Sequence, residues 1–236
     1  MLIALKKIGA GALLSLAPIV GLMAADVEVK LSPTKDYVDV VLHEGGNYRI
    51  QRNQDQENVM SAAWSKTSRK CPPFCPQPIE VAPGVMTVGE LEVFEFMEKK
   101  LNSGKGLIID ARVPSWYEKG TIPGSINIPF TVFDHAPTDI EIEEAFAQIG
   151  VQPRGEIGLV DSLLGKLGHP PEGKTEHWDF SRAPDLMLWC NGPWCGQSPR
   201  AIQGLLALGY PAHKIYYYRG GMQMWQVLGL PTLIPE

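Results

Sequence analysis

The stretch that most constrains the fold runs from Asp185 to Arg200 and reads DLMLWCNGPWCGQSPR. A short apolar run ends on Cys190 and passes into a glycine-containing loop. Ser198-Pro199 then predicts the start of a helix, with serine as the N-cap and proline at the first helical position. Such a turn points backbone N–H groups and the positive end of the helix dipole into the loop. A cysteine there is expected to be more acidic than a free one.

The chain has 236 residues, enough for one full domain with an extension. Its 44% hydrophobic and 20% charged residues are typical of a globular protein rather than a disordered one. The net charge is −5 and the basic residues are scattered, so no nucleic-acid partner is expected.

Residues 1–24 have the order of a secretory signal peptide: two lysines, an apolar run and small residues at the end. The alternative is an uncleaved anchor, because the run approaches the roughly 20 residues that span a bilayer. No stop-transfer flank follows, which favours cleavage. We therefore expect an exported or periplasmic protein with no membrane contact after cleavage, in a compartment that favours disulfides.

Residues 25–85 are expected to form an N-terminal extension. Strand-like segments at 37–42 and 48–51 flank a Gly-Gly turn, which predicts a hairpin. A rigid, proline-rich connection follows, and it contains Cys71 and Cys75. Their spacing differs from the two-residue gap of zinc sites, so these residues are interpreted as a disulfide and no metal is expected.

From residue 86 to 236, helical and strand patterns alternate, apart from an irregular insertion at 151–184. Short buried-type strands are predicted at 107–110, 125–129 and 215–218, and helices at 88–101, 138–149 and after residue 198. This order predicts an α/β domain with a central, mainly parallel sheet flanked by helices. In such sheets, ligands bind at the carboxyl ends of the strands, where Cys190 lies.

Three ordered signatures in this part resemble the rhodanese-like family. The first is Asp110-Ala-Arg112 with Glu118, Gly120 and the run 122–129; the second runs from Leu188-Trp-Cys190 through Ser198 to Tyr210. The third consists of Gly220-Gly221, Trp225 and the segment 229–232. Together they cover about residues 86–236 and imply the three-layer fold of that family.

The resemblance implies a sulfurtransferase or persulfide carrier with Cys190 as the nucleophile. The loop is two residues longer than the usual single-domain form, Gln197 replaces the usual arginine, and Cys195 is an additional thiol. Cys195 could attack a persulfide or pair with Cys190. We interpret Asp110, Arg112 and Glu118 as supporting residues that fix the loops. The candidate substrate-binding loop comprises Asn191, Gly192, Trp194, Gly196, Gln197, Ser198 and Arg200.

Two other functions stay open: a thiol–disulfide redox protein or sensor using Cys190 and Cys195, and a non-catalytic binding module. The expected partners are a small sulfane-sulfur donor, a protein thiol acceptor or an exported redox protein, and no cofactor is expected. A phosphatase or arsenate reductase needs an arginine six residues after its nucleophile. Gly196 stands six residues after Cys190, so that reading is rejected.

Overall fold

The computed structural model describes residues 27–156, 158, 163, 167 and 173–235. The expected signal peptide lies outside the described residues. A five-stranded parallel sheet forms the centre, in the order β3-β9-β8-β4-β5. Its strands are β3 (Met86–Val88), β4 (Gly106–Asp110), β5 (Ser125–Asn127), β8 (Asp185–Trp189) and β9 (Ile215–Tyr218). The predicted α/β class is confirmed.

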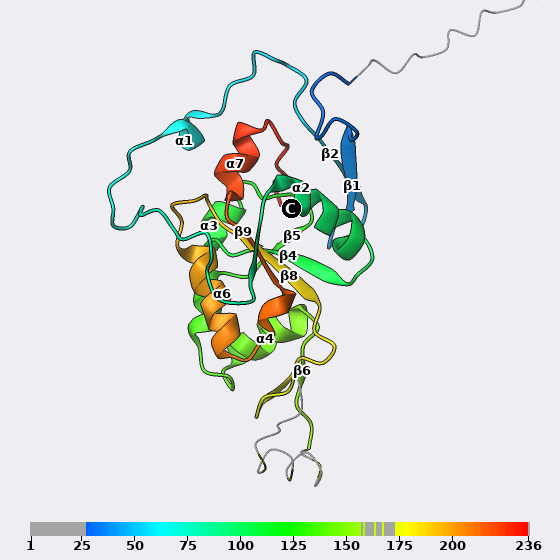
Figure 1. Ribbon diagram of the computed structural model, residues 1–236, viewed down its shortest axis with the longest axis vertical. Helices are drawn as coiled ribbons and strands as arrows, with labels where there is room; N and C mark the ends of the chain where they lie inside the picture. The colour runs from blue at the N-terminus through cyan, green and yellow to red at the C-terminus, as the bar shows by residue number, and fades with distance from the viewer. Residues whose placement is uncertain (1–26, 157, 159–162, 164–166, 168–172, 236) are drawn as a thin grey trace, which may run out of the picture.

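Helices cover both faces of this sheet (Figure 1). On one face, α4 (Ile140–Gln148), α6 (Gln197–Ala207) and the 3₁₀ turn η2 (Phe130–Asp134) bury a core with the sheet. On the other face lie α2 (Glu90–Phe96), the π-helical turn η1 (Met97–Leu101) and α7 (Gly221–Val227). Because both faces are covered, β8 is a continuous apolar run rather than an alternating one.

Strand β9 shows how the pleat distributes side chains between the two faces. Tyr217 is buried in the core on the α6 side, whereas Tyr218 is buried in the core on the α2 side. Tyr216 lies half-buried on that second side, against Phe96. Only the middle tyrosine of the three therefore faces the same layer as the loop that enters α6.

The N-terminal extension contains the predicted hairpin, formed by β1 (Tyr37–Val41) and β2 (Asn47–Gln51). Its inward residues Val38, Val40 and Ile50 are buried in the core on the α2 side. The chain then continues through α1 (Ala62–Ser65) and runs along the α7 and α6 side of the domain (Figure 1). Among the described residues, no helix is long and apolar enough to cross a bilayer.

Two predicted helix starts differ from the structure. Helix α2 begins at Glu90 with Gly89 as the N-cap, because Met86–Val88 pair with β9 as the edge strand β3. Helix α6 begins at Gln197, so Ser198 does not cap it; the Ser198 hydroxyl instead bonds the Cys190 sulfur. Pro199 lies in the first turn, where its missing N–H removes no helical hydrogen bond.

The remaining described elements are short. They comprise α3 (Pro114–Tyr117), the 3₁₀ turn η3 (Ala212–Lys214) and a small antiparallel pair, β6 (Gln152–Pro153) with β7 (Trp178–Asp179). The pair β6–β7 lies within the stretch 151–184 that we interpreted as an irregular insertion. Much of that stretch lies outside the described residues.

Candidate active site

The carboxyl ends of the central strands meet at one edge of the sheet and carry the candidate residues. Cys190 follows β8 directly, and Asp110 ends the neighbouring strand β4. This is the edge at which open parallel sheets bind ligands. The fold therefore places Cys190 at the middle of that edge, between β4 and β9.

The Cys190 thiol is buried between β8 and the start of α6. Its side chain is 2% exposed, and that of Cys195 is 5% exposed; both are free thiols. The Ser198 hydroxyl donates to Cys190 Sγ at 3.0 Å, and the Cys190 thiol donates to the Cys195 carbonyl at 3.3 Å. The helix start therefore packs directly against the sulfur of Cys190.

Cys195 is held beside Cys190 by weak sulfur hydrogen bonds. Asn191 Nδ2 donates to Cys195 Sγ at 3.8 Å, and the Cys195 thiol donates to Gln197 Oε1 at 3.8 Å. The residue that replaces the usual arginine therefore contacts the second cysteine. The tight turn is closed by a hydrogen bond from the Cys195 N–H to the Gly192 carbonyl at 2.9 Å.

The two thiols differ in acidity. The pKa of Cys195 is lowered, first by a hydrogen bond with the Cys190 thiol and further by the backbone N–H groups of Gln197 and Asn191, against the effect of burial. The pKa of Cys190 is raised well above its usual value, first by burial and then by Cys195, although Ser198 opposes this. Cys195 therefore ionises first, while Cys190 keeps its proton.

The order in which the two thiols ionise predicts how they react with iodoacetamide as pH changes. A lowered pKa means more thiolate at neutral pH, so alkylation of Cys195 should reach half its maximum at a lower pH than alkylation of a free cysteine does. Cys190→Ala removes the largest cause of the shift and should move the midpoint of Cys195 upward. Rates measured against pH with peptide mapping test this, and an unchanged midpoint in the variant would contradict it.

Gly221 holds the backbone of the loop from the side of α7. Its φ is +54°, and a Cβ built on it would lie 2.2 Å from the Cys190 carbonyl oxygen. That oxygen accepts a hydrogen bond from the Met222 N–H at 2.9 Å. Only glycine combines this conformation with so close an approach, so the start of α7 fixes where Cys190 leaves its strand.

A buried ion pair supports the neighbouring strand end. Arg112 and Asp110 are 1% and 0% exposed, and Arg112 donates to both carboxylate oxygens at 2.8 and 2.6 Å. The guanidinium also donates to the Gly120 carbonyl and lies over the Trp189 ring, one residue before Cys190. The Thr121 hydroxyl donates to Asp110. Glu118, which we expected in this group, is exposed at the end of α3, so the pair is completed by Thr121 and the Gly120 carbonyl instead.

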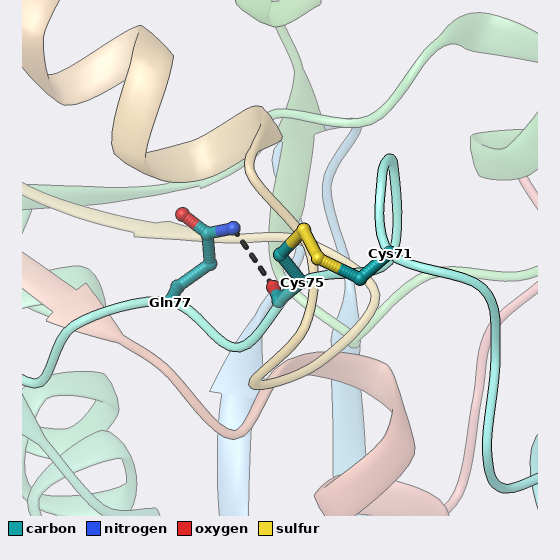
Figure 2. Close-up of a disulfide and its surroundings, with 3 residues drawn as sticks. All are labelled: Cys71, Cys75 and Gln77. Carbon is teal, nitrogen blue, oxygen red and sulfur yellow. Dashed lines mark hydrogen bonds between the residues drawn. A yellow bond between two sulfur atoms is a disulfide. The ribbon is translucent and has the colours of Figure 1, made fainter.

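A segment of the N-terminal extension lies across the loop, and we call residues 69–77 the strap. Cys71 and Cys75 form a disulfide within it, and Gln77 Nε2 donates to the Cys75 carbonyl at 3.0 Å (Figure 2). The Gln77 N–H donates to the Pro193 carbonyl at 2.8 Å, and its carbonyl accepts from Arg219. The Gln77 amide also lies over Gly196.

Aromatic contacts also hold the strap against the loop. The Phe74 ring meets the Trp194 ring edge-on at 5.3 Å, and the Arg69 guanidinium lies 4.4 Å from the Trp194 ring centre. On its other side, Trp194 Nε1 donates to Gln223 Oε1 in α7. Trp194 is therefore held between the strap and α7, on the outer side of the loop.

The strap is expected to limit access to the two thiols. In a Cys71→Ser, Cys75→Ser variant the strap loses its cross-link and should open more often, since local opening governs the reactivity of covered groups. We expect alkylation of Cys190 and Cys195 to accelerate roughly three- to tenfold. Thr67→Ala, on an exposed residue beside the strap, is the control. Equal rates in all three proteins would show that the strap does not control access.

Arg200 does not contact the two thiols of the loop. Its guanidinium pairs with Asp134 at 2.6 Å and lies over the Phe130 ring. The structure thus places most of the predicted loop residues around the thiols and Arg200 away from them. Among the described residues, no group of three or more His, Cys, Asp and Glu side chains is arranged to hold a metal ion.

Sequence reasoning missed Tyr217 and Gln77. Tyr217 belongs to a strand that reads as three equivalent tyrosines, and the pairing of β9 decides which of them faces the thiols. Gln77 is separated from the loop by more than one hundred residues, and no local pattern connects the two segments. The strand alternation was the signal that could have separated Tyr217 from its neighbours.

Residues 94–228 match the family model of the rhodanese-like domain. That match covers more than half of the chain. The chain belongs to the rhodanese-like domain family. The strap precedes the matched residues, so the cover over the thiols comes from outside the part that defines the family.

Solved structures resemble this rhodanese-like chain at low identity. A human single-domain sulfurtransferase is 22% identical, with 59% of this chain and 93% of that chain covered and a TM-score of 0.31. A rhodanese-related protein from Thermoplasma volcanium is 16% identical, with 64% and 99% covered and a TM-score of 0.35. A protein from Rhodopseudomonas palustris described as a possible tyrosine phosphatase is 16% identical, with 65% and 88% covered and a TM-score of 0.39. No curated protein matches the chain.

Proposed function

We propose that this rhodanese-like protein is an exported sulfurtransferase or persulfide carrier that accepts sulfane sulfur on Cys190. The observation that carries the proposal is the placement of Cys190 at the end of the central strand, against the Ser198 hydroxyl and the start of α6. The backbone N–H and the hydroxyl of Ser198 both favour a negative sulfur at this position. A persulfide carries its charge on the outer sulfur, which is the kind of group that such donors stabilise.

The acidity of the thiols supports a role for Cys195 in the first step. Cys190 keeps its proton, and the adjacent Cys195 thiolate can accept it as Cys190 attacks the donor. With thiosulfate, a bond forms between Cys190 Sγ and the outer sulfur of the donor. The sulfur–sulfur bond of the donor breaks, and sulfite leaves with the electron pair. A protein thiol or another small acceptor would then take the sulfur from Cys190.

Export is proposed on the residue order of positions 1–24, and the Cys71–Cys75 disulfide agrees with an oxidising compartment. The acceptor or reductant would then be a small thiol or an exported redox protein. Intact mass of the protein recovered from cells, compared with that of the full chain, tests whether residues 1–24 are removed.

Sulfur transfer is tested on reduced protein treated with thiosulfate or polysulfide. We expect a mass gain of one sulfur atom, mapped to the peptide that contains Cys190. The Cys195→Ser variant is measured in parallel so that an internal reaction cannot remove the added sulfur. If neither donor adds sulfur to Cys190 in this variant, the proposal is wrong and the domain is a binding module or a redox protein.

One observation favours a second candidate function. Cys190 and Cys195 interact as a buried pair of free thiols, so the loop could work as a reversible dithiol–disulfide couple. This candidate predicts a measurable redox equilibrium of the loop in glutathione or dithiothreitol buffers with no sulfane donor present. A loop that stays reduced under mild oxidants would exclude it.

A further inference from the structure

The candidate site holds a second thiol in contact with the proposed sulfur acceptor. We propose that Cys195 attacks the persulfide on Cys190, so that the domain reduces sulfane sulfur to hydrosulfide and is left with a Cys190–Cys195 disulfide. This inference rests on the proposed function of Cys190 as acceptor. It adds an activity, the release of sulfide, that a rhodanese loop with one cysteine cannot carry out alone.

The loop places Cys195 beside Cys190, whose sulfur it would attack. The Cys190 thiol donates to the Cys195 carbonyl at 3.3 Å, and each thiol shifts the pKa of the other. Both side chains are almost completely buried, at 2% and 5% exposed. A small external thiol must displace this cover before it can reach the persulfide, whereas Cys195 is already in place. Proximity of this kind favours the internal reaction.

The step balances in atoms, electrons and protons. Cys195 Sγ forms a bond with Cys190 Sγ, and the bond from Cys190 Sγ to the outer sulfur breaks with its electron pair on that outer sulfur. The proton that Cys195 took from Cys190 in the first step passes to the leaving sulfur, which departs as HS⁻. The sulfane sulfur gains two electrons and the two thiols lose two. The disulfide that remains needs a dithiol reductant from outside the chain before the next turnover.

The hydroxyl of Tyr217 is buried on the same side of the sheet as α6. Tyr217 is fully buried, and among the described residues its hydroxyl has no hydrogen-bond partner. Tyr217 pairs in the sheet with Leu188, two residues before Cys190, and both are buried on the α6 side of the sheet, while the charges of Cys190 and Cys195 raise its pKa. Burial raises the pKa of Tyr217, so it keeps its proton and remains a donor. We assign it as a positioning residue that donates to the outer sulfur while charge builds up there, because a buried donor without a partner is costly unless a ligand uses it.

A single-turnover experiment tests the release of sulfide. Reduced full-length protein is mixed with excess thiosulfate in the absence of other thiols, and sulfide, intact mass and thiol content are followed together. Wild type should release about one equivalent of sulfide per chain and lose both loop thiols to a disulfide. Cys195→Ser and Cys195→Ala should keep the added sulfur on Cys190 and release at least roughly tenfold less sulfide.

The outcomes separate this inference from the proposed function. If the Cys195 variants carry the persulfide and wild type carries it equally, with no sulfide and no loop disulfide, Cys195 does not resolve it and the inference is wrong. If no protein takes up sulfur, the proposed function itself fails. Agreement between the serine and alanine variants excludes an effect of either new side chain, and circular dichroism shows that both are folded.

Tyr217→Phe tests the role of the hydroxyl with Tyr216→Phe as the matched control on the same strand. We expect sulfide release in Tyr217→Phe to slow by roughly tenfold, because one hydrogen bond to a developing anion is lost. Persulfide formation and KM for thiosulfate should stay near wild type in both variants. Tyr216→Phe should also release sulfide at the wild-type rate. Equal release rates in the two variants would exclude Tyr217 from the reaction.

Discussion

Replacing Cys190 with serine is expected to lower kcat/KM for sulfur transfer by at least about 10³, to the rate without protein. A serine hydroxyl cannot form a persulfide, and Cys195 lacks the hydroxyl donor that Ser198 gives to Cys190 at 3.0 Å. The measurement is thiocyanate formation from thiosulfate and cyanide, with single-turnover mass analysis beside it. Serine fits the same small, buried position, so unfolding should not explain the loss.

The matched control for this prediction is Cys195→Ser. It should keep sulfur uptake, because the acceptor and Ser198 are intact. Uptake should be slower at neutral pH, because the base that receives the Cys190 proton is missing. The opposite pattern, with uptake lost in Cys195→Ser and kept in Cys190→Ser, would make Cys195 the sulfur acceptor and overturn the assignment of the loop.

Replacing Arg112 with methionine is expected to lower the free energy of unfolding by about 3–5 kcal/mol, because it leaves the Asp110 carboxylate buried without its partner. Asp110 and Arg112 are 0% and 1% exposed, and the guanidinium also bonds the Gly120 carbonyl and covers Trp189. Urea unfolding followed by tryptophan fluorescence gives the measurement. A loss of less than about 1 kcal/mol would show that the pair contributes little to stability.

Two further variants test whether the unpaired Asp110 charge causes the loss of stability. Arg49→Met breaks an ion pair with Asp39 that has similar geometry but lies exposed on the hairpin, and it should leave stability almost unchanged. The double variant Asp110→Leu, Arg112→Met removes both buried charges and should recover part of the loss. A double variant as unstable as Arg112→Met would mean that packing over Trp189, rather than the unpaired charge, causes the loss.

Local sequence patterns were sufficient to predict the strand and helix on either side of Cys190 and insufficient where distant segments meet. The apolar run before Cys190 and the helical stripe after it predicted β8 and α6, because burial on both faces and helical periodicity leave clear traces in sequence. Strand β3 was missed because three residues that pair with β9 look like the approach to a helix start. Ser198 was predicted as a cap, although its hydroxyl is used by Cys190.

The candidate site likewise combines residues that local sequence patterns could predict with residues that only the folded chain brings together. Asp110 and Arg112 could be paired from a two-residue spacing at a strand end, whereas Glu118 was grouped with them because it belongs to the same signature of the family resemblance. Turn geometry places Glu118 on the surface and brings Thr121 to the carboxylate. The strap could not be placed from sequence, because its contacts with Pro193 and Trp194 depend on where the whole extension folds back.

The edge strand β3 has a consequence for self-association. Residues 94–228 define the family match, yet β3 ends at Val88 and the hairpin β1–β2 lies earlier still. A chain that began at Phe94 would leave the backbone N–H and carbonyl groups of β9 unpaired along one side and expose the apolar residues that the hairpin covers. An open strand beside uncovered apolar surface is a template for strand addition between molecules. The N-terminal extension therefore replaces the open side of β9 with a short edge strand of three residues and covers the apolar surface beside it, which leaves less of the sheet available to other copies of the chain.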